Sequence, residues 1–281
     1  MQVFEQRRLL MIETQLRTNK VTDNRVLDAF GVIPREVFVD PERSELAYID
    51  EDLAIGYGRF LLEPMVFARL VQALDLKKED SVLDIGAASG YSSAVLSRLV
   101  QSVVGIEKVE SLAEFGQKKM SEIDVDNAVI LGGALTDGFN DDAPYNAIII
   151  EGTVEAVPES LLEQLTPDGR LVTIVKPADE VQGRALKYVR SGSGFAHSVL
   201  FDANTPVPCQ WQSRGQNEQN SAPKQKKWPK DCKATLGGSR GMKPPQPTAQ
   251  ITQRDPFGVC ELRRTTRVTS NKPHDPIVRT P

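Results

Sequence analysis

The first 207 residues of this chain contain no cysteine and only one histidine, His197. Without cysteine, this part of the chain can form neither a disulfide framework nor a thiol nucleophile. The single histidine disfavours a histidine-based metal cluster and a Ser-His-Asp triad. The three cysteines, Cys209, Cys232 and Cys260, follow residue 207 at spacings that match no metal-ligand pattern, so we expect free thiols and no bound metal.

Long hydrophobic runs are also missing. No stretch approaches the roughly 20 apolar residues that span a bilayer. The N-terminal sequence MQVFEQRRLLMIETQLR places charges every few residues, unlike the continuous apolar core of a secretory signal. We therefore expect a cytoplasmic protein without a membrane segment.

The composition changes abruptly near residue 207 of the 281. Lys and Arg number 20 against 33 Asp and Glu in residues 1–207, but 14 against 5 in residues 208–281. The last 74 residues also hold 10 of the 18 prolines and few apolar side chains, too few to offset the conformational entropy lost on folding. We expect residues 1–207 to form an acidic folded unit, followed by a disordered tail. An altered reading frame and a genuine extension remain open as the origin of that tail.

The hydrophobic pattern predicts helices followed by an alternating α/β region. The first helix covers 9–16, a second starts at a Thr22 cap and ends before Pro34, and a third spans 65–76 after an extended surface segment at 40–58. Strands are expected at 81–85, 102–107, 128–131, 146–151 and 170–175, with helices near 91–100, 109–123 and 157–165, and a closing hairpin of 185–190 and 195–201. The predicted fold is a doubly wound, mostly parallel seven-stranded, Rossmann-like sheet with N-terminal helices.

The sequence VLDIGAASGYSSAVL (82–96) predicts a buried strand, a glycine-containing turn and a helix. Ligands of doubly wound sheets bind at the carboxyl ends of the strands beside this first turn, where Gly86 and Gly90 allow close approach to the backbone. A dinucleotide fingerprint requires glycine at position 88 and again at 91, where this chain has Ala88 and Tyr91. This argues against a nicotinamide dehydrogenase. The alternative is a tight turn that binds nothing.

Two carboxylates flank the turn. Glu107 ends the second strand 21 residues after Gly86, near the ~20-residue offset at which an acidic side chain accepts hydrogen bonds from ribose hydroxyls. Asp84 could face the cationic part of S-adenosylmethionine. The alternatives are a solvated strand end for Glu107 and a cap on the turn amides for Asp84.

Several further segments match one family in order and spacing. They are QLR (15–17), VLDAF (26–30), IPREVFV (33–39), AYIDEDLAIGYGR (47–59), VLDIGAASGY (82–91), GIEKVE (105–110), APYNAIII (143–150) and VPESLLEQLTPDGRLVTIV (157–175). From about Met11 to Pro206 the chain resembles the protein-L-isoaspartate O-methyltransferases. These class I enzymes use S-adenosylmethionine to methylate the side-chain-derived carboxyl of damaged aspartyl residues.

The resemblance implies a cofactor, a set of binding residues and three parts of the chain. These parts are an N-terminal helical and substrate-loop segment (1–64), an S-adenosylmethionine-binding core (65–207) and the basic, Pro-rich tail (208–281). By the resemblance, Glu107 holds the ribose, and the other cofactor contacts come from Asp84, Gly86, Ala87, Ser89, Gly90, Tyr91 and Leu135.

The chain departs from the family at three places. Ala88 replaces a glycine, and Gly133-Ala134-Leu135 replaces the Gly-Asp-Gly near the adenine. Leu62 stands where the family has the serine assigned the active-site role, so the catalytic residue is unknown. Arg59 could bind a substrate carboxylate instead. The alternative is that Arg59 and Leu62 only pack the loop.

The leading hypothesis is a carboxyl O-methyltransferase that acts as a monomer on protein or peptide carboxylates, with weak activity on isoaspartyl peptides. The second is a catalytically weak or inactive member that serves as a protein-interaction module. A nucleic-acid methyltransferase is suggested only by the basic tail. It is disfavoured because residues 1–207 are acidic and because Glu151-Gly152-Thr153 follows the fourth strand, where adenine N6-methyltransferases have a Pro-Pro-aromatic segment.

Overall fold

The computed structural model describes residues 2–192 and 194–206. The predictions for residues 208–281, including the state of the three cysteines, fall outside these residues.

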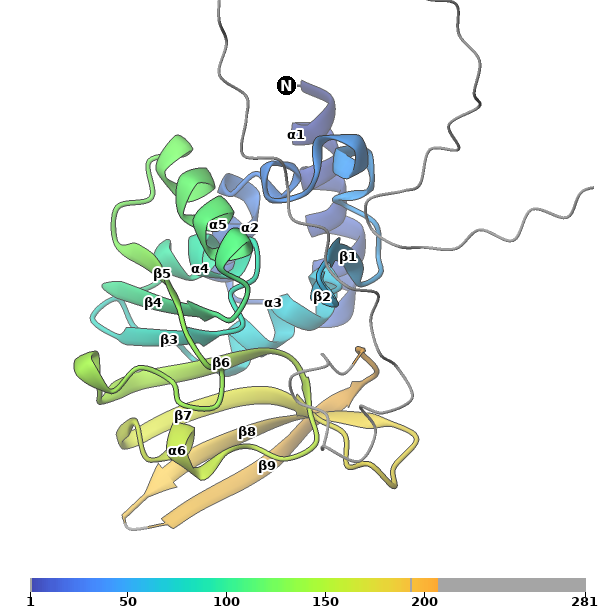
Figure 1. The fold of residues 1–281 in the computed structure, drawn as a ribbon. Helices are drawn as coiled ribbons and strands as arrows, with labels where there is room; N and C mark the ends of the chain where they lie inside the picture. Colours follow the sequence, from blue (N-terminus) through green and yellow to red (C-terminus); the bar gives the residue numbers. More distant parts are fainter. Residues whose placement is uncertain (1, 193, 207–281) are drawn as a thin grey trace, which may run out of the picture. The chain divides into compact units, whose positions relative to one another are not determined.

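A seven-stranded sheet is the main element of the described chain (Figure 1). Its order is β5-β4-β3-β6-β7-β8-β9; the pairs from β5 to β7 are parallel, and β8 and β9 add antiparallel. The bounds are β3 (Ser81–Ile85), β4 (Ser102–Glu107), β5 (Ala128–Gly132), β6 (Tyr145–Val154), β7 (Leu165–Val175), β8 (Gly183–Ser191) and β9 (Gly194–Ala203). The predicted mostly parallel, seven-stranded fold is confirmed.

Six α-helices accompany the sheet in the described residues. They are α1 (Gln2–Met11), α2 (Asn24–Val32), α3 (Pro64–Ala73), α4 (Tyr91–Ser97), α5 (Glu110–Glu122) and α6 (Glu159–Leu162). The first continues as a π-turn (Ile12–Leu16) and a 3₁₀ turn (Arg17–Asn19), and further 3₁₀ turns span Arg35–Phe38, Pro41–Leu46 and Asn140–Asp142. Within the described part of the chain, no helix is both long and apolar enough to cross a membrane.

Three local predictions are wrong in detail. Helix α2 is capped by Asp23 instead of Thr22, because the Asp23 carboxylate accepts from the Arg25 amide at 2.8 Å. The helix expected at 157–165 is shortened to α6, because Leu165 already pairs with Tyr145 in the sheet. The segment 40–58 holds a 3₁₀ turn and a strand, and its Ala47 and Tyr48 are buried.

The two faces of the sheet bury two hydrophobic clusters, because successive strand residues point to opposite sides. Val82 and Val103 belong to the cluster that includes residues of α1 to α5, whereas Leu83 and Val104 belong to the one that includes α6. The helices therefore cover both faces, as the doubly wound pattern predicts. The site described next lies at the carboxyl ends of β3, β4 and β6.

Four aromatic rings join the N-terminal segment to the first turn of the sheet. Tyr91 lies with its ring centroid 6.2 Å from Phe30, 5.8 Å from Phe38 and 5.9 Å from Phe67. All four rings are fully buried. The N-terminal helices therefore share one core with the sheet. This packing fixes the position of the turn between β3 and α4.

Candidate active site

A short hairpin places Arg59 beside the turn that follows β3. Strands β1 (Leu53–Gly56) and β2 (Arg59–Leu61) are joined by Tyr57 and Gly58, whose φ angles are 55° and 68°. Two left-handed residues in a two-residue loop match the right-handed twist of the flanking strands. The Arg59 side chain, at the start of β2, is 2% exposed.

The turn after β3 needs left-handed backbone at several positions. The φ angles are 85° at Gly86, 51° at Ala88 and 94° at Gly90. Glycine adopts such angles freely, but alanine does so at a cost of about 1–2 kcal/mol. The departure from the family at Ala88 therefore falls on a strained residue.

Glu107 ends β4 with a fully buried carboxylate whose two oxygens are both engaged. Oε1 accepts from the Val109 amide at 2.9 Å. Oε2 accepts from the Ala88 amide at 2.9 Å and from Arg59, with Nη2 at 3.0 Å and Nε at 3.2 Å. Arg59 Nη2 also donates to the Gly86 carbonyl at 2.7 Å. The guanidinium thus links the glycine turn to the carboxylate predicted to hold a ribose.

Asp84 lies inside β3, completely buried. Its Oδ2 accepts from the Ser92 and Ser93 hydroxyls, both at 2.6 Å, while Oδ1 is buried without a hydrogen-bond partner. Burial raises the pKa of Asp84 to about 6, against the two serine hydrogen bonds that lower it. The carboxylate therefore keeps one unused acceptor beside the turn.

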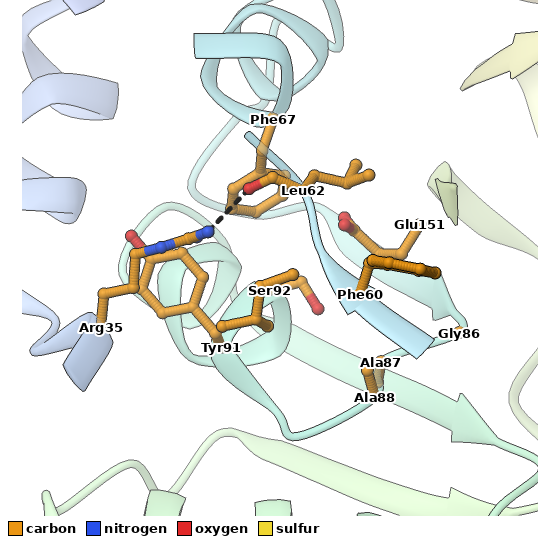
Figure 2. A pocket seen from close by; sticks show the side chains of 11 residues that line it. Arg35, Phe60, Leu62, Phe67, Gly86, Ala87, Ala88, Tyr91, Ser92 and Glu151 are labelled. Atoms are coloured by element: carbon orange, nitrogen blue, oxygen red, sulfur yellow. Dashed lines mark hydrogen bonds between the residues drawn. The ribbon is translucent and has the colours of Figure 1, made fainter. Parts of the chain in front are cut away.

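A small cavity, of about 10 Å³, lies between the end of β2 and the turn (Figure 2). It is lined by Arg35, Phe60, Leu61, Leu62, Phe67, Gly86, Ala87, Ala88, Tyr91, Ser92 and Glu151. Ligand pockets usually measure about 300–1,000 Å³. In the arrangement that the structure shows, the cavity is therefore far too small for a nucleoside cofactor.

Two charged residues of this cavity were not among the predicted site residues. Arg35 is buried over the Tyr91 ring, 4.8 Å from its centroid, and donates to the Leu62 carbonyl at 2.7 Å (Figure 2). Its Nη1 has no partner, and burial lowers its pKa. Glu151, in β6, has a buried Oε1 without a partner, and burial, followed by the nearby Asp84, raises its pKa well above the usual value. Two sequence signals could have identified them. The IPR motif contains Arg35, and Glu151 is the charged residue at the end of a predicted apolar strand.

The remaining predicted residues are distributed around the turn and beyond it. Ala87 lines the cavity, and Ser89 has a buried hydroxyl without a partner. Leu62 is buried and lines the cavity, as Phe67 does. Leu135 lies in the cluster on the α6 side of the sheet, apart from the cavity-lining residues. No group of three or more potential ligands for a metal ion occurs within residues 2–192 and 194–206.

Comparisons with known proteins point to one family. The family model for protein-L-isoaspartate(D-aspartate) O-methyltransferase matches residues 6–200. Protein-L-isoaspartate O-methyltransferase 2 of Pelobacter propionicus is 40% identical over 178 residues, covering 63% of this chain and 79% of that protein. The protein-L-isoaspartate O-methyltransferase of Vibrio atlanticus is 35% identical over 187 residues, covering 66% of this chain and 88% of that protein.

Solved structures show the same fold. A protein-L-isoaspartate O-methyltransferase matches with a TM-score of 0.63 at 22% identity, covering 70% of this chain and 64% of that one. A Plasmodium falciparum protein described as a putative enzyme of this type, solved with S-adenosyl-L-homocysteine, matches with a TM-score of 0.61 at 19% identity, covering 71% and 97%. Together with the family model, these matches show that the chain belongs to the protein-L-isoaspartate O-methyltransferases, a family of S-adenosylmethionine-dependent enzymes.

Proposed function

We propose that this chain transfers a methyl group from S-adenosylmethionine to a carboxylate of a protein or peptide, with isoaspartyl residues as the first candidates. The observation that carries the proposal is the junction of the turn with β4, where the Ala88 amide and the Glu107 carboxylate meet at 2.9 Å. This junction stands at the carboxyl ends of parallel strands, where doubly wound sheets bind nucleotides.

The groups at the turn fit such a cofactor. Glu107 offers a carboxylate to the ribose hydroxyls, and the glycine turn exposes backbone. Asp84 Oδ1 and Ser89 Oγ are buried without partners and would face the methionine part. Unpartnered buried polar atoms are costly, which favours a bound ligand there. Ala87, Gly86, Gly90 and Tyr91 complete the proposed contacts, with Leu135 assigned by resemblance alone.

The cofactor supplies a methyl group on a positively charged sulfur, and the substrate carboxylate is already ionised at neutral pH. The chain therefore needs no strong base; it must orient the carboxylate and exclude water. Phe60 and Leu62 make the cavity wall apolar. Arg35 Nη1 is the buried donor available to a carboxylate. A contact between Arg59 and the substrate requires that its guanidinium first leave Glu107.

We expect weak turnover on isoaspartyl peptides, because Leu62 provides no hydroxyl to orient the substrate. Leu62→Ser should raise the rate of methyl-ester formation about tenfold or more, since a hydrogen bond to a charged group contributes about 1.5–3 kcal/mol. The assay follows labelled methyl transfer from S-adenosylmethionine to an isoaspartyl peptide. Leu61→Ser is the matched control, because Leu61 ends β2 immediately before Leu62 and is buried to a similar extent.

A wild-type rate equal to that of Leu62→Ser would show that the hydroxyl is dispensable here. Absence of methyl ester with both proteins, at saturating cofactor, would sink the catalytic proposal. That result would favour the second candidate, a protein-interaction module. The Arg59–Glu107 ion pair supports this candidate because it occupies the carboxylate proposed to bind the cofactor.

For either candidate we propose a cytoplasmic monomer that does not require nucleic acid. Sedimentation tests the oligomeric state, and fractionation of the expressing cell tests the location.

A further inference from the structure

Arg59 takes up the acceptor that a ribose would need. Its Nε and Nη2 both bind Glu107 Oε2, and the side chains of the pair are 2% and 0% exposed. The other oxygen, Oε1, accepts from the Val109 amide. A ribose hydroxyl can therefore reach this carboxylate fully only after the guanidinium has moved.

The same guanidinium covers the backbone of the turn at Gly86. A Cβ placed on Gly86 would come within 2.5 Å of Arg59 Nη2. The space that glycine leaves free at this position is thus filled by a side chain of the same chain. Arg59 blocks both the carboxylate and the backbone that a nucleoside would approach.

A second acceptor for the guanidinium lies on β6. Burial raises the pKa of Glu151, and the charge of Arg59 is close enough to act against this larger effect. The Cβ placed on Gly86 would be 3.4 Å from the Glu151 carbonyl, so β6 borders the turn there. Glu151 Oε1 is buried and has no hydrogen-bond partner. In sheet order, β3 lies between β4, which carries Glu107, and β6, which carries Glu151. Arg59 therefore has an occupied carboxylate on one side and an unpartnered one on the other.

We propose that Arg59 sets the affinity of the cofactor by competing with its ribose for Glu107, and that Glu151 accepts the guanidinium when the cofactor displaces it. The inference rests on the proposed cofactor site at Glu107. Breaking a buried ion pair by removing one partner is strongly destabilising, whereas exchanging one carboxylate partner for another preserves a charge-assisted hydrogen bond. In this exchange the Glu151 carboxyl releases its proton to solvent as the guanidinium reaches it. Glu151 thereby makes displacement of the guanidinium feasible.

The test is calorimetric titration of the full-length chain with S-adenosylhomocysteine. Arg59→Gln, which removes the charge but keeps a hydrogen-bond donor for Glu107, should lower Kd at least tenfold. Arg43→Gln is the matched control, because Arg43 contacts the same hairpin through the Ala54 carbonyl without reaching Glu107. Its Kd should equal that of the wild type. If Arg59→Gln impairs folding, Arg59→Lys should still lower Kd, since one ammonium cannot reproduce the contacts of the guanidinium.

Glu151 is tested in a double-mutant cycle. Glu151→Gln should raise Kd severalfold in the wild-type background and leave it unchanged when combined with Arg59→Gln. If the wild type binds measurably and both Arg59→Gln and Arg59→Lys bind equally well or more weakly, Arg59 does not compete with the cofactor. The proposed cofactor site itself would still stand. Identical effects of Glu151→Gln in both backgrounds overturn the transfer to Glu151. Absence of binding by every variant at millimolar ligand overturns both the inference and the proposed site.

Discussion

At the scale of single residues, Glu151 should make stability depend on pH. Burial, then Asp84, raises its pKa above the ordinary value of 4.5. A carboxyl with a raised pKa stabilises the folded state fully below its unfolded pKa, and this contribution is lost as the pH rises. Glu151→Gln should therefore leave the free energy of unfolding unchanged near pH 4 and increase it near pH 8, as measured by urea denaturation.

Glu79→Gln is the control, because Glu79 is exposed and should show no such difference between the two pH values. Asp84, whose pKa burial raises to about 6, loses its own contribution between its ordinary 3.8 and that value in both proteins. The difference between wild type and Glu151→Gln therefore reports Glu151 together with its charge interaction with Asp84. An equal gain at both pH values would contradict the assignment of a buried, protonated carboxyl.

Residues whose partners are near in sequence were the easier ones to predict. The spacing of Gly86 and Glu107 follows from one strand, one helix and the next strand, and the structure joins this turn to Glu107 through the Ala88 amide. Arg35 and Glu151 depend on contacts that no local pattern contains. Arg35 donates to the Ala47 and Leu62 carbonyls, which lie 12 and 27 residues away along the chain. The contact between Arg59 and Glu107 spans 48 residues and could not be predicted from spacing.

At the scale of elements, helix α5 is packed directly against the glycine turn through Gly116. A Cβ at Gly116 would lie 2.8 Å from the Ser89 carbonyl oxygen and 2.7 Å from Ile130 Cδ1. Gly116→Ala should lower the free energy of unfolding by about 1–3 kcal/mol, because overpacking outweighs the ~1 kcal/mol gain in helix propensity. Urea denaturation measures this difference.

Gly132→Ala is the matched control, since nothing lies within 4 Å of a Cβ at Gly132. Its stability should stay within about 0.5 kcal/mol of the wild type. A Gly116→Ala protein as stable as the wild type would mean that α5 can shift away from the turn without loss, and the tight contact would then have no structural importance.

The elements themselves were predictable to different degrees. Strands β3 and β4 have the bounds that their continuous apolar runs predict. Strand β7 begins at Leu165, earlier than residue 170, because pairing with β6 recruits the polar residues before the apolar run. The β1–β2 hairpin was missed because its strands are only four and three residues long.

At the scale of the whole described chain, the N-terminal helices and the sheet should unfold together. Phe30 is fully buried in the aromatic group that includes Tyr91 of the turn. Phe30→Ala should cost about 3–5 kcal/mol and keep a single transition, as followed by circular dichroism during thermal unfolding. Val32→Ala on the same helix should change stability by less than about 0.5 kcal/mol, because Val32 is 54% exposed.

Two separate transitions in Phe30→Ala would instead show that residues 1–64 form an independent unit.

The fold class was predictable at this scale because alternation of strands and helices is a long-range pattern that single errors do not change. The proposed boundary near Val207 came from charge and composition. A chain ended after Val207 is expected to unfold at the same temperature as the full chain.

The hydrogen bond from Arg35 to the Leu62 carbonyl also bears on how this chain can evolve. The guanidinium binds the main-chain carbonyl of residue 62, so it fixes the backbone there whatever side chain residue 62 carries. We therefore expect a serine at position 62 to enter a backbone that is already positioned. One substitution, Leu62→Ser, would then add a hydroxyl to the cavity wall without requiring the main chain to move.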